Sequence, residues 1–172
     1  TGNLFLKIKL MPGLTFTPRL SIDYRDSHNT AFVPELHING VETKSINNVS
    51  KSMDWNLHWI ADYMLNYEKT FNTVHNVSAA AIYSQEESKY EYLSASRNGT
   101  PNNQIQYLNS AQAEGETIYN GFQDWSFVSY IGRVGYNYSG KYYVQGSVRR
   151  DGTSRFVESN RWGTFPSVSA GW

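Results

Sequence analysis

The amino-acid sequence predicts an all-β protein, an antiparallel transmembrane β-barrel of which this chain supplies about seven consecutive strands. Three observations support this class: long segments in which apolar and polar residues alternate, connections that are alternately short and long, and aromatic residues near the short connections. Alternation indicates a strand with one apolar and one polar face, because successive side chains point to opposite sides. Strands of soluble domains usually have about 5–6 residues, far fewer than these segments offer.

The clearest alternating segment is Ser52–Tyr67. At about 3.3 Å per residue it would extend roughly 50 Å as a single strand. In a membrane barrel its apolar face would meet lipid and its polar face would line the lumen. The lipid-facing candidates are Trp55, Leu57, Trp59, Tyr63 and Leu65, and the lumen-facing candidates are Asp54, Asn56, His58 and Asp62.

Six further segments repeat this alternation in whole or in part: Asn3–Leu10, Leu14–Asp26, Phe71–Glu87, Asp124–Tyr138, Lys141–Asp151 and Thr164–Trp172. Pro18 cannot donate a ladder hydrogen bond, so a local bulge is expected there. The further lipid-facing candidates are Val128, Tyr130, Val134, Tyr136, Val144 and Val148. The further lumen-facing candidates are Arg19, Asp23, Arg133, Asn137, Gln145 and Arg149.

The connections between these segments alternate in length. Short turns are expected at 11–13, 68–70 and 139–140, and longer connections at 27–51, 88–122 and 152–163, with a short helix around 104–113. Transmembrane barrels have short periplasmic turns and long extracellular loops, which sets the expected orientation. Aromatic residues at the short turns predict an interfacial girdle made of Tyr67, Phe71, Tyr138, Tyr142 and Tyr143.

Composition excludes several function classes. The 172 residues include 15 basic and 15 acidic side chains, so no basic excess suggests nucleic-acid binding. Cysteine is absent, which excludes a disulfide framework and a thiolate metal site, and the four histidines lack metal-ligand spacing. Asp54, His58 and Asp62 invite comparison with a catalytic triad, but neighbours four apart on a strand are separated by about 13 Å. We therefore expect no enzyme activity, no metal and no cofactor.

The most specific motif lies near the end of the sequence. Arg149–Phe156 reads RRDGTSRF and Asn160–Trp172 reads NRWGTFPSVSAGW. Together they resemble the barrel of SusC/RagA-type TonB-dependent transporters, outer-membrane nutrient importers of the Bacteroidetes. The resemblance spans the whole chain and is most specific over its last 45 or so residues. The motif residues are Arg149, Arg150, Asp151, Gly152, Ser154, Arg155, Phe156, Arg161, Trp162, Gly163, Phe165 and Pro166.

This resemblance implies a middle portion of a barrel of about 22 strands, without the plug domain, the TonB box or the C-terminal strand. It also implies uptake of an oligomeric nutrient, a glycan or a peptide, driven by the TonB complex and assisted by a SusD-like surface lipoprotein. A passive porin-like or solute-binding barrel is the alternative. An outer-membrane hydrolase and a soluble β-sandwich receptor are more distant alternatives.

Several side chains have two interpretations at this stage. The charges at Arg149, Asp151 and Arg155 either contact cargo or plug, or pair with each other around a turn at Gly152. Cargo specificity is expected in the long connections, where aromatic side chains either stack on sugar rings or pack the loops: Tyr90, Tyr92, Tyr107, Tyr119 and, at a strand mouth, Trp125. The acidic residues Glu86, Glu87, Glu114 and Glu116 are expected to be solvated at strand ends or in loops.

Overall fold

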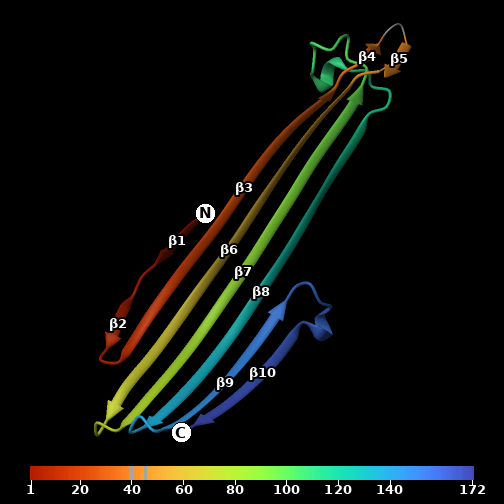
Figure 1. Ribbon diagram of the computed structural model, residues 1–172. Helices are drawn as coiled ribbons and strands as arrows, with labels where there is room; N and C mark the ends of the chain where they lie inside the picture. The colour runs from red at the N-terminus through yellow and green to blue at the C-terminus, as the bar shows by residue number, and fades with distance from the viewer. Residues whose placement is uncertain (39–40, 45) are drawn as a thin grey trace. The chain divides into compact units, whose positions relative to one another are not determined.

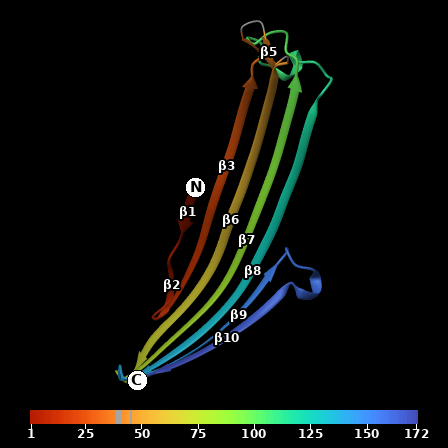
Figure 2. The ribbon, with the colours of Figure 1, turned by 45° about the vertical axis from the view of Figure 1, so that its right-hand side comes forward.

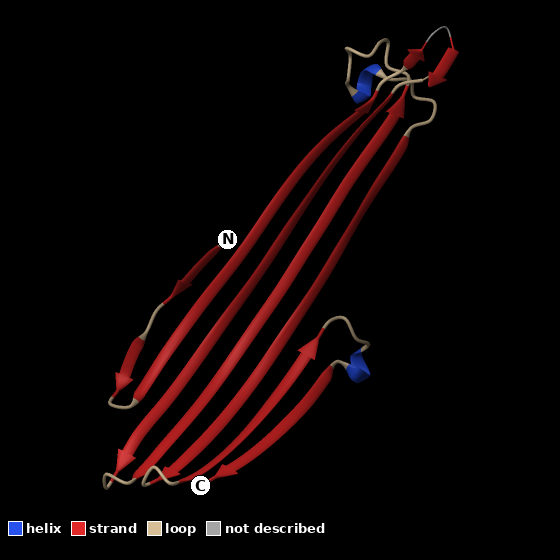
Figure 3. Ribbon diagram, viewed as in Figure 1, coloured by secondary structure: helices blue, strands red, loops and turns tan. Residues whose placement is uncertain are grey.

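The computed structural model describes residues 1–38, 41–44 and 46–172. Its strands are β1 (Gly2–Phe5), β2 (Ile8–Met11), β3 (Leu14–Val33), β4 (Leu36–Ile38), β5 (Val41–Lys44), β6 (Asn48–Phe71), β7 (His75–Asn98), β8 (Thr117–Tyr138), β9 (Tyr142–Thr153) and β10 (Trp162–Gly171). Two short 3-10 helices, η1 (Leu108–Ser110) and η2 (Glu158–Asn160), lie in the connections β7–β8 and β9–β10 (Figure 3).

One sheet contains eight of these strands in the order β1-β3-β6-β7-β8-β9-β10, with β2 also paired to β3. From β3 onward the strands β3, β6, β7, β8, β9 and β10 lie side by side in chain order and their directions alternate, while β1 and β2 both run antiparallel to β3 (Figures 1 and 2). The short strands β4 and β5 form a separate two-stranded sheet. The predicted all-β antiparallel meander is therefore confirmed, with β1 and β2 together taking the place of one predicted strand.

Four of the strands are longer than the alternation predicted. β3 has 20 residues, β6 and β7 have 24 each, and β8 has 22. Most of 88–98 and 117–122, expected as loop, is therefore strand, and so is 27–33. Backbone hydrogen bonds between strands can continue where neither face is consistently apolar. In such stretches apolar and polar residues do not alternate, so the sequence does not identify them as strand.

The expected bulge at Pro18 is absent, and the partner strand is interrupted instead. The pairing keeps the same register from Phe5↔Arg19 to Ile8↔Phe16, so no residue is inserted in either strand. The Leu6 N–H donates to the Pro18 carbonyl oxygen at 3.1 Å, while proline has no N–H to return the bond. The missing bond separates β1 from β2.

Two of the three short turns lie within one residue of the expected positions, and the third differs by a few residues. The β6–β7 turn lies at 72–74, after the predicted 68–70, and Asn72 and Thr73 adopt positive φ values of 46° and 59°. Asparagine tolerates this left-handed conformation better than most residues. In the β8–β9 turn Ser139 and Gly140 have φ values of 53° and 69°, as a two-residue hairpin turn requires. The predicted helix at 104–113 reduces to the three residues of η1.

The chain divides into two compact units. The first contains residues 1–23, 58–88 and 124–172, and the second contains 24–57 and 89–123. In the first unit the short turns are hydrogen-bonded to their neighbours: the Glu68 N–H donates to Gly13 O at 2.8 Å and the Ser139 N–H donates to Val74 O at 2.7 Å. Among the described residues Val49 is the only buried hydrophobic side chain, so the eight-stranded sheet has no hydrophobic core of its own. No described helix has the length and apolarity to cross a membrane.

Candidate functional site

Ring contacts across the strands of the first unit define one face of the sheet. Tyr63 stacks with Tyr83 at 5.9 Å between centroids, Tyr83 contacts Tyr130 at 5.3 Å, and Tyr130 stacks with Trp162 at 6.1 Å. We call the side carrying these four rings the aromatic face, and the opposite side the polar face. Strand alternation then places nine of the predicted lipid-facing residues on the aromatic face: Trp59, Tyr63, Leu65, Val128, Tyr130, Val134, Tyr136, Val144 and Val148.

The predicted lumen-facing residues of the first unit lie on the polar face. They are Arg19, Asp23, His58, Asp62, Arg133, Asn137, Gln145 and Arg149. The remaining four candidates, Asp54, Trp55, Asn56 and Leu57, belong to the second unit, where they alternate along β6 in the same way.

Asp62 joins three strands on the polar face. Its carboxylate accepts a hydrogen bond from Arg19 Nε at 3.1 Å and another from the Ser84 hydroxyl at 2.7 Å. The Arg19 side chain is 46% exposed and that of Asp62 is 16% exposed, so solvent screens this ion pair and its contribution is about 0.2–1 kcal/mol. The value of the contact is geometric, because it holds β3, β6 and β7 in one register.

His58 lies at the centre of a second polar-face cluster. Its Nε2 is 2.7 Å from a carboxylate oxygen of Glu86, and its ring is 5.9 Å from the ring of Trp125. The Arg155 guanidinium lies over the same tryptophan ring, 4.6 Å from its centroid. Asp54 and Asp62 do not join this cluster as hydrogen-bond partners of His58, so the triad-like spacing in the sequence has no catalytic counterpart.

The expectation that Glu86 and Glu87 are solvated at a strand end is wrong. Both lie inside β7 and point to opposite faces, where Glu86 pairs with His58 and Glu87 accepts a bond from the Trp59 indole at 3.1 Å. In the second unit, Glu116 pairs with Arg97. The partners come from a neighbouring strand or a distant segment, and their register cannot be read from one strand alone.

The Arg149 and Asp151 side chains of the terminal motif form hydrogen bonds within the sheet. Asp151 accepts hydrogen bonds from the Ser129 hydroxyl at 2.7 Å and from Arg149 Nε at 2.7 Å, and Ser129 is 3% exposed. On the aromatic face Trp162 covers Gly152 so closely that a Cβ there would lie 2.8 Å from the indole ring. This arrangement favours the structural interpretation of the Arg149 and Asp151 charges.

The other motif residues extend this junction. The Ser154 hydroxyl accepts a bond from the Ser126 N–H at 2.8 Å and so ties the end of β9 to β8. The Phe165 ring covers Gly163, where a Cβ would lie 2.8 Å from it. Pro166 is the register partner of Val148 within the sheet. Phe156 and Arg161, which lie on either side of η2, are exposed.

The second unit contains an ordered junction that the sequence did not predict. Asn47 is 1% exposed, and its side chain accepts a bond from the Thr100 N–H at 2.7 Å and donates to Thr100 O at 3.3 Å. The neighbouring Asn48 amide contacts Ser96 and Asn98. An asparagine in a polar loop carries no sequence signal that separates such a buried bridge from a solvated side chain.

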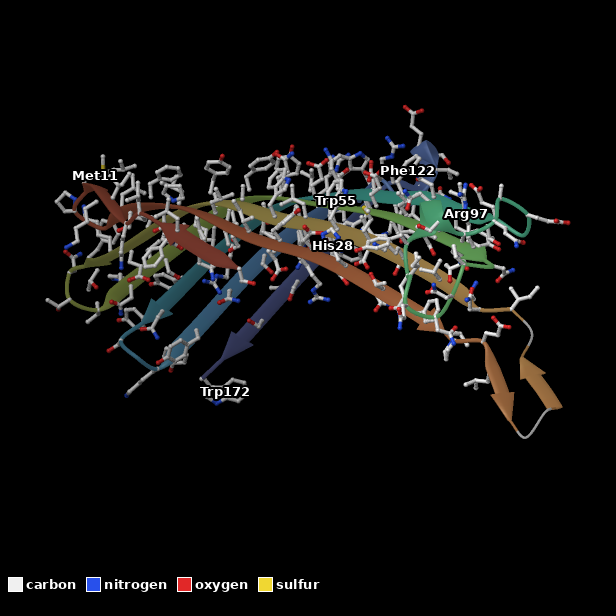
Figure 4. All side chains as sticks on the ribbon, turned by 90° about the horizontal axis from the view of Figure 1, so that it is seen from above. Met11, His28, Trp55, Arg97, Phe122 and Trp172 are labelled. Atoms are coloured by element: carbon white, nitrogen blue, oxygen red, sulfur yellow. The ribbon has the colours of Figure 1, made fainter. Side chains whose placement is uncertain are left out.

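Arg97 fastens the long connection between β7 and β8. Its guanidinium forms an ion pair with Glu116 and donates to the Leu108 carbonyl oxygen of η1 at 3.4 Å. Figure 4 labels Arg97 among the side chains. Arg97 was expected inside a loop, yet it lies in β7, so the strand end itself holds the loop in place.

Four of the five aromatic side chains considered for cargo stacking lie in strands. Tyr90 and Tyr92 belong to β7, and Tyr119 and Trp125 belong to β8. Tyr92 packs over Gly121 and the Arg155 guanidinium lies over the Trp125 ring, so these two rings have partners within the protein. Tyr107 alone lies in a connection, where it is 63% exposed and has Lys51 Nζ 5.8 Å from its ring centroid.

Aromatic side chains gather near the β8–β9 turn, where part of the interfacial girdle was expected. Tyr138 stacks with Tyr142 at 6.4 Å, and His75 lies 5.2 Å from the Tyr138 ring. Tyr143 follows Tyr142 in β9 and therefore points to the polar face, so it was wrongly assigned to the same girdle. No group of three or more potential metal ligands occurs among the described residues.

No family model matches the chain. The chain is 32% identical over 169 residues to TonB-dependent receptor P39 of Formosa agariphila, an alignment that covers 98% of this chain and 16% of that receptor. It is 49% identical over 47 residues to TonB-dependent receptor SusC of Bacteroides thetaiotaomicron, covering 27% of this chain and 5% of SusC.

Among solved structures, the chain matches one described as the RagAB peptide transporter with a TM-score of 0.90 and 19% identity, over 98% of this chain and 19% of that one. This likeness establishes the fold. The curated relatives are receptors and not enzymes, in agreement with the expected absence of catalysis. The two-faced antiparallel sheet and these relatives place the chain in the SusC/RagA-type TonB-dependent receptor family, as part of the wall of its transmembrane β-barrel.

Proposed function

We propose that this chain forms part of the wall of an outer-membrane importer that takes up an oligomeric nutrient, a glycan or a peptide, with TonB-derived energy. The observation that carries the proposal is the alignment of 98% of the chain with a TonB-dependent receptor. The chain spans 16% of that relative's length, and on this proposal the energy-coupling parts would belong to other segments of the receptor. The solved relative described as a peptide transporter supports a peptide as one class of cargo.

The aromatic face is proposed to meet lipid. Large apolar side chains on it are open to the surroundings, with Val134 59%, Tyr130 50% and Val148 47% exposed. A strand face of this composition is unfavourable in water and suits the hydrocarbon region of a bilayer. Trp59 fits one edge of that region, because its indole N–H donates to Glu87 and its ring is apolar.

The polar face is proposed to line the lumen. Several of its charged side chains already have partners within the sheet: Arg19 pairs with Asp62 across strands, Arg149 pairs with Asp151 within β9, and the His58 ring contacts Glu86. These carboxylates are therefore less available to hold a passing solute. Transport requires binding that is favourable enough for entry and weak enough for release. A wall of paired charges and amides meets this requirement for oligomeric cargo, with no covalent chemistry.

The long connections are proposed to be extracellular and the short turns periplasmic, as in other transmembrane barrels. The second unit contains the β4–β5 hairpin and the connection that holds η1. These segments would face cargo and a SusD-like surface lipoprotein acting as a lid. Contact with the TonB complex would come through parts of the receptor outside this chain.

Uptake in cells tests the proposal. Labelled oligosaccharides and oligopeptides are offered to a host that produces the full-length receptor with its neighbouring lipoprotein, with and without a functional TonB. Accumulation that disappears when TonB is removed supports active import. Accumulation that persists without TonB identifies a passive porin-like barrel and refutes the proposal.

The lid partner is tested separately. An affinity-tagged full-length receptor is purified in mild detergent, and we expect a SusD-like lipoprotein to be recovered with it in a stoichiometric amount. Recovery of the receptor alone, under conditions that keep it active in uptake, contradicts the proposed partnership.

A further inference from the structure

A groove crosses the aromatic face of the first unit between β6 and β9. It consists of two adjoining hollows of about 490 and 610 Å³, which share Leu65, Ala81, Gly132 and Val148 as lining residues. We call it the outer groove. The strands β6, β7, β8 and β9, which form its floor, each have hydrogen-bonded neighbours on both sides within the sheet. Only Thr164 of the edge strand β10 contributes to its rim, so a further strand paired to β10 would leave the floor open.

Nothing in the protein fills the floor of the outer groove. A Cβ built on Gly146 would meet no atom within 4 Å, and a Cβ on Gly132 would meet only Val148 Cγ1 at 3.7 Å. Neither glycine has a positive φ, so the backbone does not require glycine at either position. Glycine inside a strand weakens it, and close approach of another molecule is one recognised reason for its presence.

A cation closes one end of the groove. Arg150 lines the second hollow, and its guanidinium lies over the Trp162 ring, 5.2 Å from the centroid. Among the described residues no ion pair includes Arg150; the nearby Asp151 points to the polar face, where it binds Arg149 and Ser129. An unpaired cation on a lipid-facing surface is unfavourable unless it reaches an interface or an anion.

We infer that the outer groove is a binding site for lipid A of lipopolysaccharide, with an acyl chain in the hollows and a phosphate on Arg150. The inference rests on the proposed function, because it needs the aromatic face toward lipid and the long connections outside. Arg150 lies near the end of β9, which leads into the connection holding η2. In that orientation it reaches the outer leaflet, whose lipid is lipopolysaccharide.

The dimensions agree with one acyl chain. From Gly146 to Arg150 is about 13 Å along the strand, or about 10 Å of depth at a barrel strand tilt of about 40°, against about 15 Å for half of the hydrocarbon core. The guanidinium offers a planar set of donors to phosphate oxygens, and its position over the indole keeps those donors directed outward. The site therefore combines an apolar hollow for an acyl chain with a cation for a phosphate, at the depth where lipid A carries its acyl chains and its phosphate.

Lipid binding is measured on the full-length receptor in mild detergent, by native mass spectrometry during titration with purified lipid A. Arg150→Gln removes the charge and keeps most of the stem, whereas Gly132→Val fills the groove. We expect each to weaken lipid A binding by about tenfold or more, because each removes one principal contact. Arg133→Gln is the matched control, since Arg133 follows Gly132 in β8 and points to the polar face.

The outcomes separate this inference from the proposed function. Equal binding by wild type, Arg150→Gln and Gly132→Val overturns the lipid site, as does a wild-type preference for zwitterionic phospholipid over lipid A. Heat-modifiable migration in electrophoresis confirms that each variant has folded, and a Cβ at Gly132 would be in ordinary van der Waals contact with Val148 alone. TonB-dependent uptake without selective lipid A binding would refute the lipid A site and leave the proposed function intact. Selective lipid A binding without TonB-dependent uptake would refute the proposed function and leave the lipid A site intact.

Discussion

Replacing Val134 by arginine tests which face of the sheet meets lipid. Val134 lies on the aromatic face and is 59% exposed, with Gly146 as its register partner in β9. The matched control is Gln145→Arg on the polar face, whose register partner in β8 is also a glycine, Gly135. The two changes therefore place the same side chain in adjacent rungs of one ladder, on opposite faces.

The expected magnitude follows from the position of Val134 between two aromatic layers. Tyr130 and Tyr138 lie four residues to either side in β8, which is about 13 Å along the strand in each direction. Arginine near the bilayer midplane of a barrel costs about 2–4 kcal/mol, and the cost falls to about 0–1 kcal/mol near the interfaces. Val134→Arg is thus expected to shift the folding equilibrium roughly 30- to 1,000-fold.

The assay is reversible unfolding of the full-length receptor in lipid vesicles, followed by tryptophan fluorescence and heat-modifiable migration. We expect Val134→Arg to lose about 2–4 kcal/mol and Gln145→Arg to lose less than about 1 kcal/mol. Equal losses, or a larger loss for Gln145→Arg, would refute the assignment of the faces. Abundance of the two variants in the outer membrane provides an independent measure of the same difference.

Three further substitutions test local contacts. Gly152→Ala puts a methyl group against the indole ring that covers this glycine, and we expect a loss of about 1–3 kcal/mol in the unfolding free energy. Asn47→Ala removes both hydrogen bonds to the backbone of Thr100, and we expect faster amide exchange throughout 99–116, equivalent to about 1–3 kcal/mol of local stability. Gly13→Ala forces alanine to a φ of 85° and against the Glu68 carbonyl oxygen, and we expect a loss of more than about 1 kcal/mol in the same unfolding measurement.

Each of these expectations has an outcome that contradicts it. Unchanged unfolding of the Gly152→Ala variant would show that the indole can move away at no cost. Exchange rates that stay the same in 99–116 would show that Asn47 does not hold that connection. Gly140→Ala is the control for Gly13→Ala, because Gly140 has a φ of 69° but open space around it; an equal effect of both would show that conformation alone, and not contact with Glu68, decides the loss.

The strand pattern and the family could be predicted because their signals are local. Alternation in Ser52–Tyr67 identified β6 and assigned its residues to two faces, and the final motif identified the family. The prediction failed where alternation stops although pairing continues, as in 88–98 of β7. It also failed at Pro18, because the effect of the missing N–H falls on the partner strand and not on the strand that contains the proline.

Partnerships between strands could not be predicted, because each depends on a register that one strand does not contain. His58 and Glu86 are 28 residues apart in the sequence, and the offset that joins them is set by the pairing of β6 with β7. The bridge from Asn47 to Thr100 spans 53 residues and depends on two connections meeting. The same holds for the outer groove, whose floor combines small residues from β7, β8 and β9.

The sequence by itself determined the all-β class, the two-faced strands, the alternation of short and long connections and the family. These features follow from side-chain direction along one strand and from a contiguous motif. Only the tertiary structure decided where the strands end, which charges pair, that Trp162 covers Gly152 and that Arg150 closes a hollow on the aromatic face. Those features depend on cross-strand register, which arises when separate segments lie side by side and which no single segment encodes.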